Sequence, residues 1–121
     1  MLGSLSETDE TVIKTFEKMK GDNRYSTFVA DVNKIVGFVT VVETLAIDQP
    51  NGYIKINGLA VLPEFQHCGI GKMLMERVER LADERNISLI GLASGFQRIG
   101  AHEFYERLGY QKLSFYFRKR I

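Results

Sequence analysis

The sequence predicts an α/β domain built on a mixed β-sheet. Three strand-like segments follow one another between residues 25 and 62, which favours an antiparallel N-terminal meander. A long amphipathic helix and a second apolar segment come next, which favours one parallel β-α-β crossover. The expected order of elements is α-β-β-β-α-β-α-β. At 121 residues, the chain fits a single core, so we expect one domain over residues 1–121.

The first part of the chain predicts a helix and a hairpin. Ser6 precedes an acidic turn, and apolar residues then recur at helical spacing, so we expect a helix over residues 7–20. Residues 25–43 are rich in β-branched and aromatic residues and are divided by a turn at Val32 and Asn33. These residues therefore form the first two strands of the meander.

A loop and the third strand follow. Pro, Asn and Gly punctuate the sequence IDQPNG, which predicts a loop over residues 47–52. Residues 53–62 read as a strand, and Gly58 within them indicates a bulge or a close approach of another backbone.

The second half of the chain alternates helices with strands. The apolar run over residues 88–93 is typical of a buried strand. Residues 99–108 repeat the helical spacing, and Gly109 stands where a helix C-cap belongs. Residues 111–117 alternate in polarity and are expected to close the chain as a strand. The long helix expected before residue 88 has an apolar stripe on one side and charged residues on the other. The stripe consists of Ile70, Leu74, Val78, Leu81 and Ala82.

Composition and charge exclude several classes of protein. The net charge of +1 argues against nucleic acid as a partner. The ending FYFRKRI offers aromatic and basic side chains that suit nucleic acid, yet a closing strand with a solvated basic end explains it as well. No apolar run approaches the ~20 residues that span a bilayer. The N-terminus lacks a secretory pattern and the single Cys68 cannot form an internal disulfide, so a cytoplasmic location is expected.

The stretch QHCGIGK, residues 66–72, places two glycines between a strand and a helix. A P-loop would need glycine at position 66 and Ser or Thr at position 73, which hold Gln66 and Met73. A dinucleotide fingerprint would need a third glycine where Leu74 stands. Glycines at this junction let the backbone close around phosphates at a helix N-terminus, and an ordinary strand-to-helix turn is the alternative.

Together with LAVLPEF upstream and AHEFYERLGY downstream, this stretch resembles the GNAT superfamily of acyl-CoA-dependent N-acetyltransferases. The resemblance covers roughly residues 25–118. It implies a GNAT-like sheet and acetyl-CoA (coenzyme A) as cofactor. It also implies that the pyrophosphate is held by the segment Gln66, His67, Cys68, Gly69, Ile70, Gly71 and Lys72. No metal site is expected, because no other Cys or His lies near His67 and Cys68 in the sequence.

The resemblance also implies roles for residues outside the glycine stretch. In such enzymes the strand before the phosphate loop splays from its neighbour and pairs with the pantetheine arm, here through the amides of Leu59 and Val61. Tyr105 matches the tyrosine that protonates the leaving thiolate, and a core aromatic is the alternative. Arg98 stands where many members carry a cofactor-contacting Asn. This residue departs from the pattern, and we expect the arginine to meet the phosphates of the cofactor instead.

The acceptor side of the reaction is less defined. Glu43 is the best candidate for the base, and a structural or solvent-facing role for it is equally open. The family usually begins with one more strand and helix than this sequence supplies. We therefore expect an N-acetyltransferase that moves an acetyl group to a small-molecule or peptide primary amine by direct attack. A non-catalytic acyl-CoA-binding module is the alternative, no membrane or nucleic-acid partner is expected, and a homodimer is left open.

Overall fold

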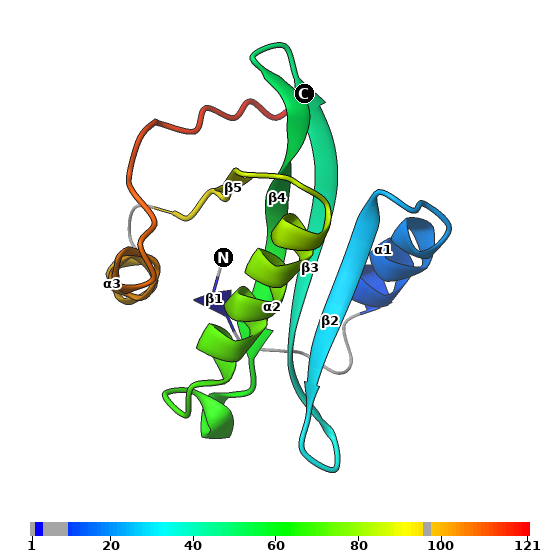
Figure 1. The fold of residues 1–121 in the computed structure, drawn as a ribbon. Coiled ribbons are helices and arrows are strands. Elements are labelled where there is room, and N and C mark those ends of the chain that lie inside the picture. The colour runs from blue at the N-terminus through cyan, green and yellow to red at the C-terminus, as the bar shows by residue number, and fades with distance from the viewer. Residues whose placement is uncertain (1, 4–9, 96–97) are drawn as a thin grey trace.

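The computed structural model describes residues 2–3, 10–95 and 98–121, which form one β-sheet with helices on both of its faces (Figure 1). The elements follow one another as β1 (Leu2–Gly3), α1 (Glu10–Lys20), β2 (Tyr25–Asp31), β3 (Ile35–Ala46), β4 (Gln49–Val61), the short 3-10 helix η1 (Pro63–Phe65), α2 (Ile70–Glu84), β5 (Ile90–Gly91) and α3 (Ile99–Arg107).

The sheet is mixed, as the sequence predicts. Strands β2, β3 and β4 form an antiparallel meander. Strand β4 also pairs in parallel with β5, which completes the β-α-β unit through α2, and in parallel with β1. The antiparallel meander and the parallel crossover are therefore confirmed, whereas β1 is a strand that sequence analysis did not predict.

The predicted irregularity at Gly58 is a β-bulge between β3 and β4. Thr40 pairs with Gly58 while the next residue, Val41, pairs with Ile56, so Asn57 is the extra residue. A Cβ atom at Gly58 would lie 3.3 Å from the Cγ2 atom of Thr40. The bulge bends β4 just before the segment that leads to the glycine stretch.

Helix α2 covers one face of the sheet and forms the core with it. Its buried side chains include the whole predicted stripe, with Met75 in addition. Each fully buried aliphatic side chain stabilises the fold by about 1.5–3 kcal/mol relative to exposure. On the same face, the guanidinium of Arg77 stacks over the ring of Phe28 at 4.2 Å. The sheet contributes Val36, Val39, Val41, Ile54, Ile56, Leu59 and Val61 to this core.

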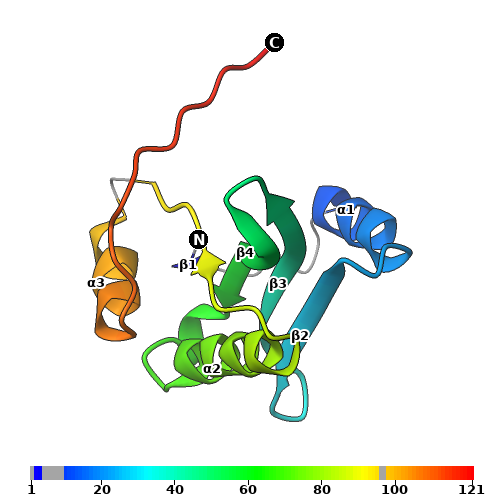
Figure 2. The ribbon, with the colours of Figure 1, turned by 45° about the horizontal axis from the view of Figure 1, so that its top comes forward.

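Helix α1 lies against the opposite face, beside the edge strand β2 (Figure 2). Phe16 and Met19 of α1 share a pocket with Tyr25 and Thr27 of β2, which point away from α2 because strand side chains alternate. The predicted helix over residues 7–20 is confirmed from Glu10 onward, and its first three residues lie outside the described ones.

The predicted loop over residues 47–52 is wrong in extent. Strand β3 continues to Ala46 and β4 begins at Gln49, so Ala46 pairs with Gln49 across a tight hairpin end. Pro50 and Gly52 lie inside β4, where the register of the β3–β4 ladder shifts between Thr44 and Ala46. The turn-favouring residues therefore accompany an irregularity in the ladder and not an open loop. Gly52 is needed there, because it has φ +79° and its Cβ would lie 2.8 Å from the Thr44 carbonyl oxygen.

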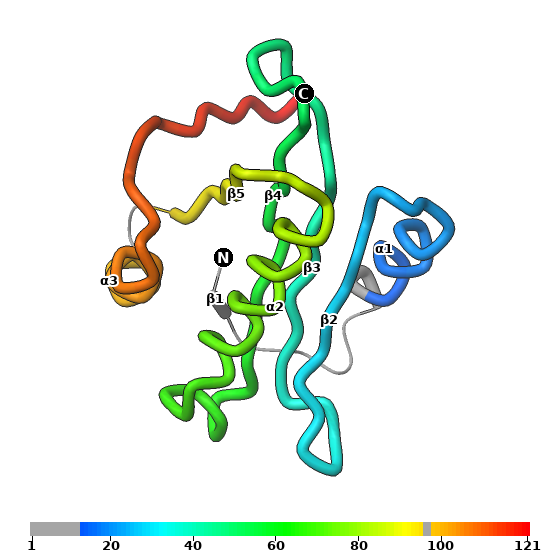
Figure 3. The backbone as a smooth tube through the Cα atoms, in the orientation of Figure 1, coloured from blue at the N-terminus to red at the C-terminus, as the bar shows by residue number. Residues whose placement is uncertain are grey.

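The predicted closing strand over residues 111–117 is also wrong. The segment after α3 is extended (Figure 3) but pairs with no strand among the described residues. Residues 111–121 are all exposed. Similarly, only Ile90–Gly91 of the predicted strand 88–93 is paired. High β-propensity needs a neighbouring strand edge to pair with, and β5 is only two residues long.

Candidate functional site

The glycine stretch forms a compact connection between β4 and α2. After β4 ends at Val61, η1 turns the chain and Gln66 returns to an extended conformation. The side-chain amide of Gln66 donates a hydrogen bond to the carbonyl oxygen of Val61 at 3.1 Å. His67 and Gly69 both have positive φ, of 65° and 85°. Gln66 thereby ties the loop to the end of the strand, a role that its spacing in the sequence did not reveal.

The N-terminus of α2 is suited to an anion. The first helical hydrogen bond runs from the amide of Met73 to the carbonyl of Gly69, at 3.1 Å. The amides of Ile70, Gly71 and Lys72 therefore precede the helical ladder. Gly69 is the N-cap and supplies no side-chain cap, and the first turn holds no acidic residue. The partial positive charge of the helix end thus remains available to an anionic group.

The two glycines of the stretch serve different purposes. Gly69 is exposed, and a Cβ atom there would meet nothing within 4 Å, so its requirement is conformational. A Cβ atom at Gly71 would instead lie 3.2 Å from Cζ of Phe104 in α3. Gly71 therefore allows α3 to approach the first turn of α2, a packing role that sequence analysis missed.

The edge of β4 opens where the resemblance expects it to. Strand β5 pairs with β4 only at Ile54 and Lys55, near the middle of β4. Farther along, at Leu59 and Ala60, the partner on this edge is β1 and not β5. The predicted gap between β4 and the segment after α2 is thus present, and β1 lies in it.

Tyr105 lies on the buried face of α3. Its side chain is 4% exposed, and its ring makes edge-to-face contacts with Phe104 (5.3 Å between centroids) and Tyr110 (6.1 Å). Burial, reinforced by the negative charge of Glu79 and by Tyr105, raises the pKa of Tyr110 to about 12. Tyr105 thus belongs to a cluster of aromatic rings. This cluster lies beside the first turn of α2, because Phe104 packs against Gly71.

Glu43 lies at the other end of α2. Its carboxylate forms an ion pair with Arg85 at 3.5 Å, and Arg85 is the C-cap of α2. Because α2 has 15 residues, this end is about 22 Å from Gly69 at a rise of ~1.5 Å per residue. The structure therefore does not bring Glu43 to the glycine stretch.

One further candidate residue, Arg98, lies at the start of α3. Arg98 is half-buried at the N-cap of α3. His102, one turn later, has its Nε2 atom 2.8 Å from the carbonyl oxygen of Gly95. This contact ties the helix to the segment that leaves β5.

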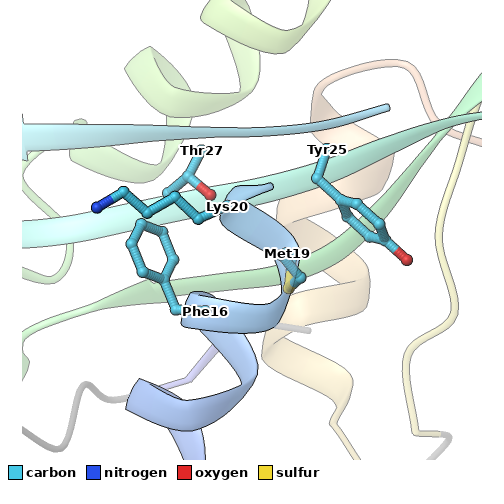
Figure 4. Close-up of a pocket in the computed structure, with 5 residues that line it drawn as sticks. All are labelled: Phe16, Met19, Lys20, Tyr25 and Thr27. Carbon is cyan, nitrogen blue, oxygen red and sulfur yellow. The ribbon is translucent and has the colours of Figure 1, made fainter. Parts of the chain in front are cut away.

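A separate pocket of ≈ 220 Å³ lies between α1 and β2 (Figure 4). Its lining holds none of the predicted site residues, and it lies on the sheet face opposite α2. Among residues 2–3, 10–95 and 98–121, no group of three or more His, Cys, Asp or Glu residues could hold a metal ion. Within the same residues, none of the helices combines the length and the apolar character needed to cross a membrane.

Comparisons with known proteins show the family to which the chain belongs. Residues 3–110 match the acetyltransferase (GNAT) family. An uncharacterized N-acetyltransferase of Methanocaldococcus jannaschii is 33% identical over 87 residues, which cover 70% of this chain but only 38% of that protein.

Two solved structures share the fold. A transcriptional regulator from Bacillus halodurans superposes with a TM-score of 0.83 at 26% identity, over 93% of this chain and 77% of that one. The structure of AAC(6')-Iy, in complex with a bisubstrate analog containing CoA, has a TM-score of 0.78 at 17% identity, over 96% and 83% of the two chains. The match over residues 3–110 covers most of the sequence, and the chain belongs to the GNAT family of acetyltransferases.

Proposed function

We propose that the chain binds acetyl-CoA with its pyrophosphate at the N-terminus of α2 and transfers the acetyl group to a primary amine. The observation that carries this proposal is the uncapped first turn of α2. Gly69 is in the left-handed conformation, the amides of Ile70 to Lys72 precede the helical ladder, and the first turn holds no acidic residue. Lys72 is exposed and adds a positive charge next to the phosphates.

The cofactor arm would run along the edge of β4 that β5 leaves unpaired. The amides of Leu59 and Val61 lie in the strand that leads directly to the glycine stretch, so one ligand can reach both sites. Main-chain pairing of this kind fixes the position of an extended ligand as an added strand would. Arg98, at the start of α3, is the further candidate for a contact with the cofactor.

In the reaction, the amine nitrogen attacks the thioester carbonyl carbon and the carbon–sulfur bond breaks. The thiolate of coenzyme A takes a proton from the hydroxyl of Tyr105. The amine gives its own proton to a water chain that leads to solvent, and Glu43, which lies at the other end of α2, is the further candidate acceptor of that proton. A phenol suits this step because its hydroxyl can donate a proton and phenols and thiols are close in acidity in water. No covalent enzyme intermediate is involved.

The acceptor is a small-molecule or peptide amine. Support for an amine comes from the family. The analog bound to AAC(6')-Iy joins CoA to an acetylneamine. At 17% identity that structure informs the fold only. The acceptor of this chain is therefore best found with a panel that spans polyamines, aminoglycosides and peptides.

The alternative is a module that binds acyl-CoA without turning it over. Two observations favour it: Glu43 is engaged by Arg85, and the Tyr105 side chain is 4% exposed in the core. Both readings predict that coenzyme A binds. Only the enzyme predicts release of thiol that depends on an added amine.

The test is an assay of free thiol with acetyl-CoA and the panel of amines. Thiol release above the rate without amine supports the enzyme, whereas binding of coenzyme A without release by any amine supports the module. Cys68→Ala should leave turnover largely intact. Loss of all activity in that variant, with an acetyl-cysteine trapped in the parent, would overturn direct attack.

A further inference from the structure

A segment of the chain itself occupies the edge of β4 that the cofactor arm requires. Leu2 pairs with Leu59 and Gly3 with Ala60, in parallel. Strand β3 takes the opposite edge of β4 along its length. Strand β1 therefore lies on the edge that β5 leaves open, between α2 and α3 (Figure 1).

The same backbone groups cannot serve β1 and a pantetheine arm at once. In a parallel ladder, each outward-facing N–H and C=O group of β4 bonds to one neighbour. Leu59 and Ala60 are paired with β1, and Leu59 is among the residues proposed to pair with the cofactor. Occupation of this edge by β1 and by the arm is therefore mutually exclusive.

We propose that β1 is an intramolecular competitor of acyl-CoA, so that only molecules in which Leu2–Gly3 has left β4 bind the cofactor arm. This inference rests on the proposed function. It adds that the apparent affinity for coenzyme A is set partly by the position of the N-terminal segment. A ligand that needs a minor state binds more weakly by the fraction of molecules in that state.

The short length of β1 makes the competition reversible. It has two residues, against 13 in β4. Because each net backbone hydrogen bond is modest in water, so short an edge strand can leave without unfolding the sheet. We expect release of β1 to tighten coenzyme A binding about tenfold, which corresponds to ~1.4 kcal/mol.

Two sets of full-length variants test this competition by calorimetry with coenzyme A. The double variant Leu2→Pro with Gly3→Pro removes both amide donors of β1, and Leu2→Ala with Gly3→Ala keeps them as a matched control. The double proline variant should bind coenzyme A about tenfold more tightly than the parent does. The double alanine variant should bind coenzyme A with the affinity of the parent. Equal affinities in all three proteins would contradict the competition.

A disulfide provides the opposite test. Paired parallel strands lie ~4.8 Å apart, which is within disulfide range, so Gly3→Cys with Ala60→Cys should cross-link when Cys68→Ser removes the native thiol. The oxidised protein should bind coenzyme A at least tenfold more weakly than the same protein reduced by dithiothreitol. Failure of the disulfide to form, or equal binding in both states, would overturn the inference. If none of these proteins bound coenzyme A, including the reduced disulfide variant and the double proline variant, the proposed function itself would be contradicted.

Discussion

A charge placed at Gly69 tests whether the N-terminus of α2 holds phosphates. Gly69 is exposed with φ +85°, and a Cβ atom there meets nothing within 4 Å. Asn and Asp have the same size, and both tolerate the left-handed conformation better than other residues do. Gly69→Asn and Gly69→Asp should therefore fold alike and differ by one negative charge.

The expected difference follows from the exposure of the site. Two unit charges ~4 Å apart interact by about 1 kcal/mol in water, so a carboxylate beside two phosphates costs about 2 kcal/mol. This corresponds to roughly 30-fold in Kd, at ~1.4 kcal/mol per tenfold.

Calorimetry with coenzyme A measures this difference directly, and circular dichroism checks that both variants fold. The gap between Asp and Asn should shrink in 1 M salt, where the screening length is about 3 Å. If the Asp variant bound coenzyme A as tightly as the Asn variant at low salt, the pyrophosphate would not rest at this helix end.

Three further predictions concern the cluster around α3. Tyr105→Phe should keep its affinity for coenzyme A while turnover falls by about 10²–10⁴, as expected for loss of a general acid; unchanged turnover would leave Tyr105 as a core residue only. Gly71→Ala crowds Phe104, whose Cζ atom would lie 3.2 Å from the new Cβ. The loss in free energy of unfolding caused by Gly71→Ala should be about 1 kcal/mol smaller when Phe104→Leu is also present. If urea denaturation showed that the effects of the two substitutions simply add, the contact would be contradicted. Tyr110 has a pKa raised to about 12 by burial, so the folded chain holds a proton that the unfolded chain loses above its ordinary value of about 10. The stability that Tyr110 contributes is fully present below pH ~10 and is lost as the pH rises to about 12. Tyr110→Phe should therefore show a smaller drop in urea midpoint between pH ~10 and ~12 than the parent does.

Local patterns in the sequence predicted much of the fold. The apolar stripe of α2, the turn at Val32 and Asn33 and the bulge at Gly58 each depend on residues close together in the chain, and all are present. Gly109 follows Leu108, the C-cap of α3, and its φ of +95° is the left-handed conformation in which glycine commonly ends a helix.

Features that depend on distant partners were not predictable in this way. The segment over residues 111–117 has the right alternation, but it pairs with no described strand. The contact of Gly71 with Phe104 and the ion pair of Glu43 with Arg85 join residues 33 and 42 positions apart. Only the assembled sheet and helices bring these groups together.

The position of β1 is the clearest case of this limit. Leu2 and Gly3 carry little strand signal of their own, and their partners Leu59 and Ala60 lie far along the chain. A two-residue pairing depends on the edge that happens to be open, and β5 leaves this edge open by pairing only at Ile54 and Lys55. The same opening is the one that the proposed cofactor arm needs.

Titration of the ¹⁵N-labelled chain with coenzyme A, followed by amide chemical shifts, reports directly on where the cofactor binds. We expect the largest changes at the amides of Gly69, Ile70, Gly71 and Lys72, with a second group at Leu59 to Val61 as β1 is displaced. Changes confined to the exposed segment 111–121, or to the pocket between α1 and β2, would contradict the assignment of this helix end and strand edge to the cofactor.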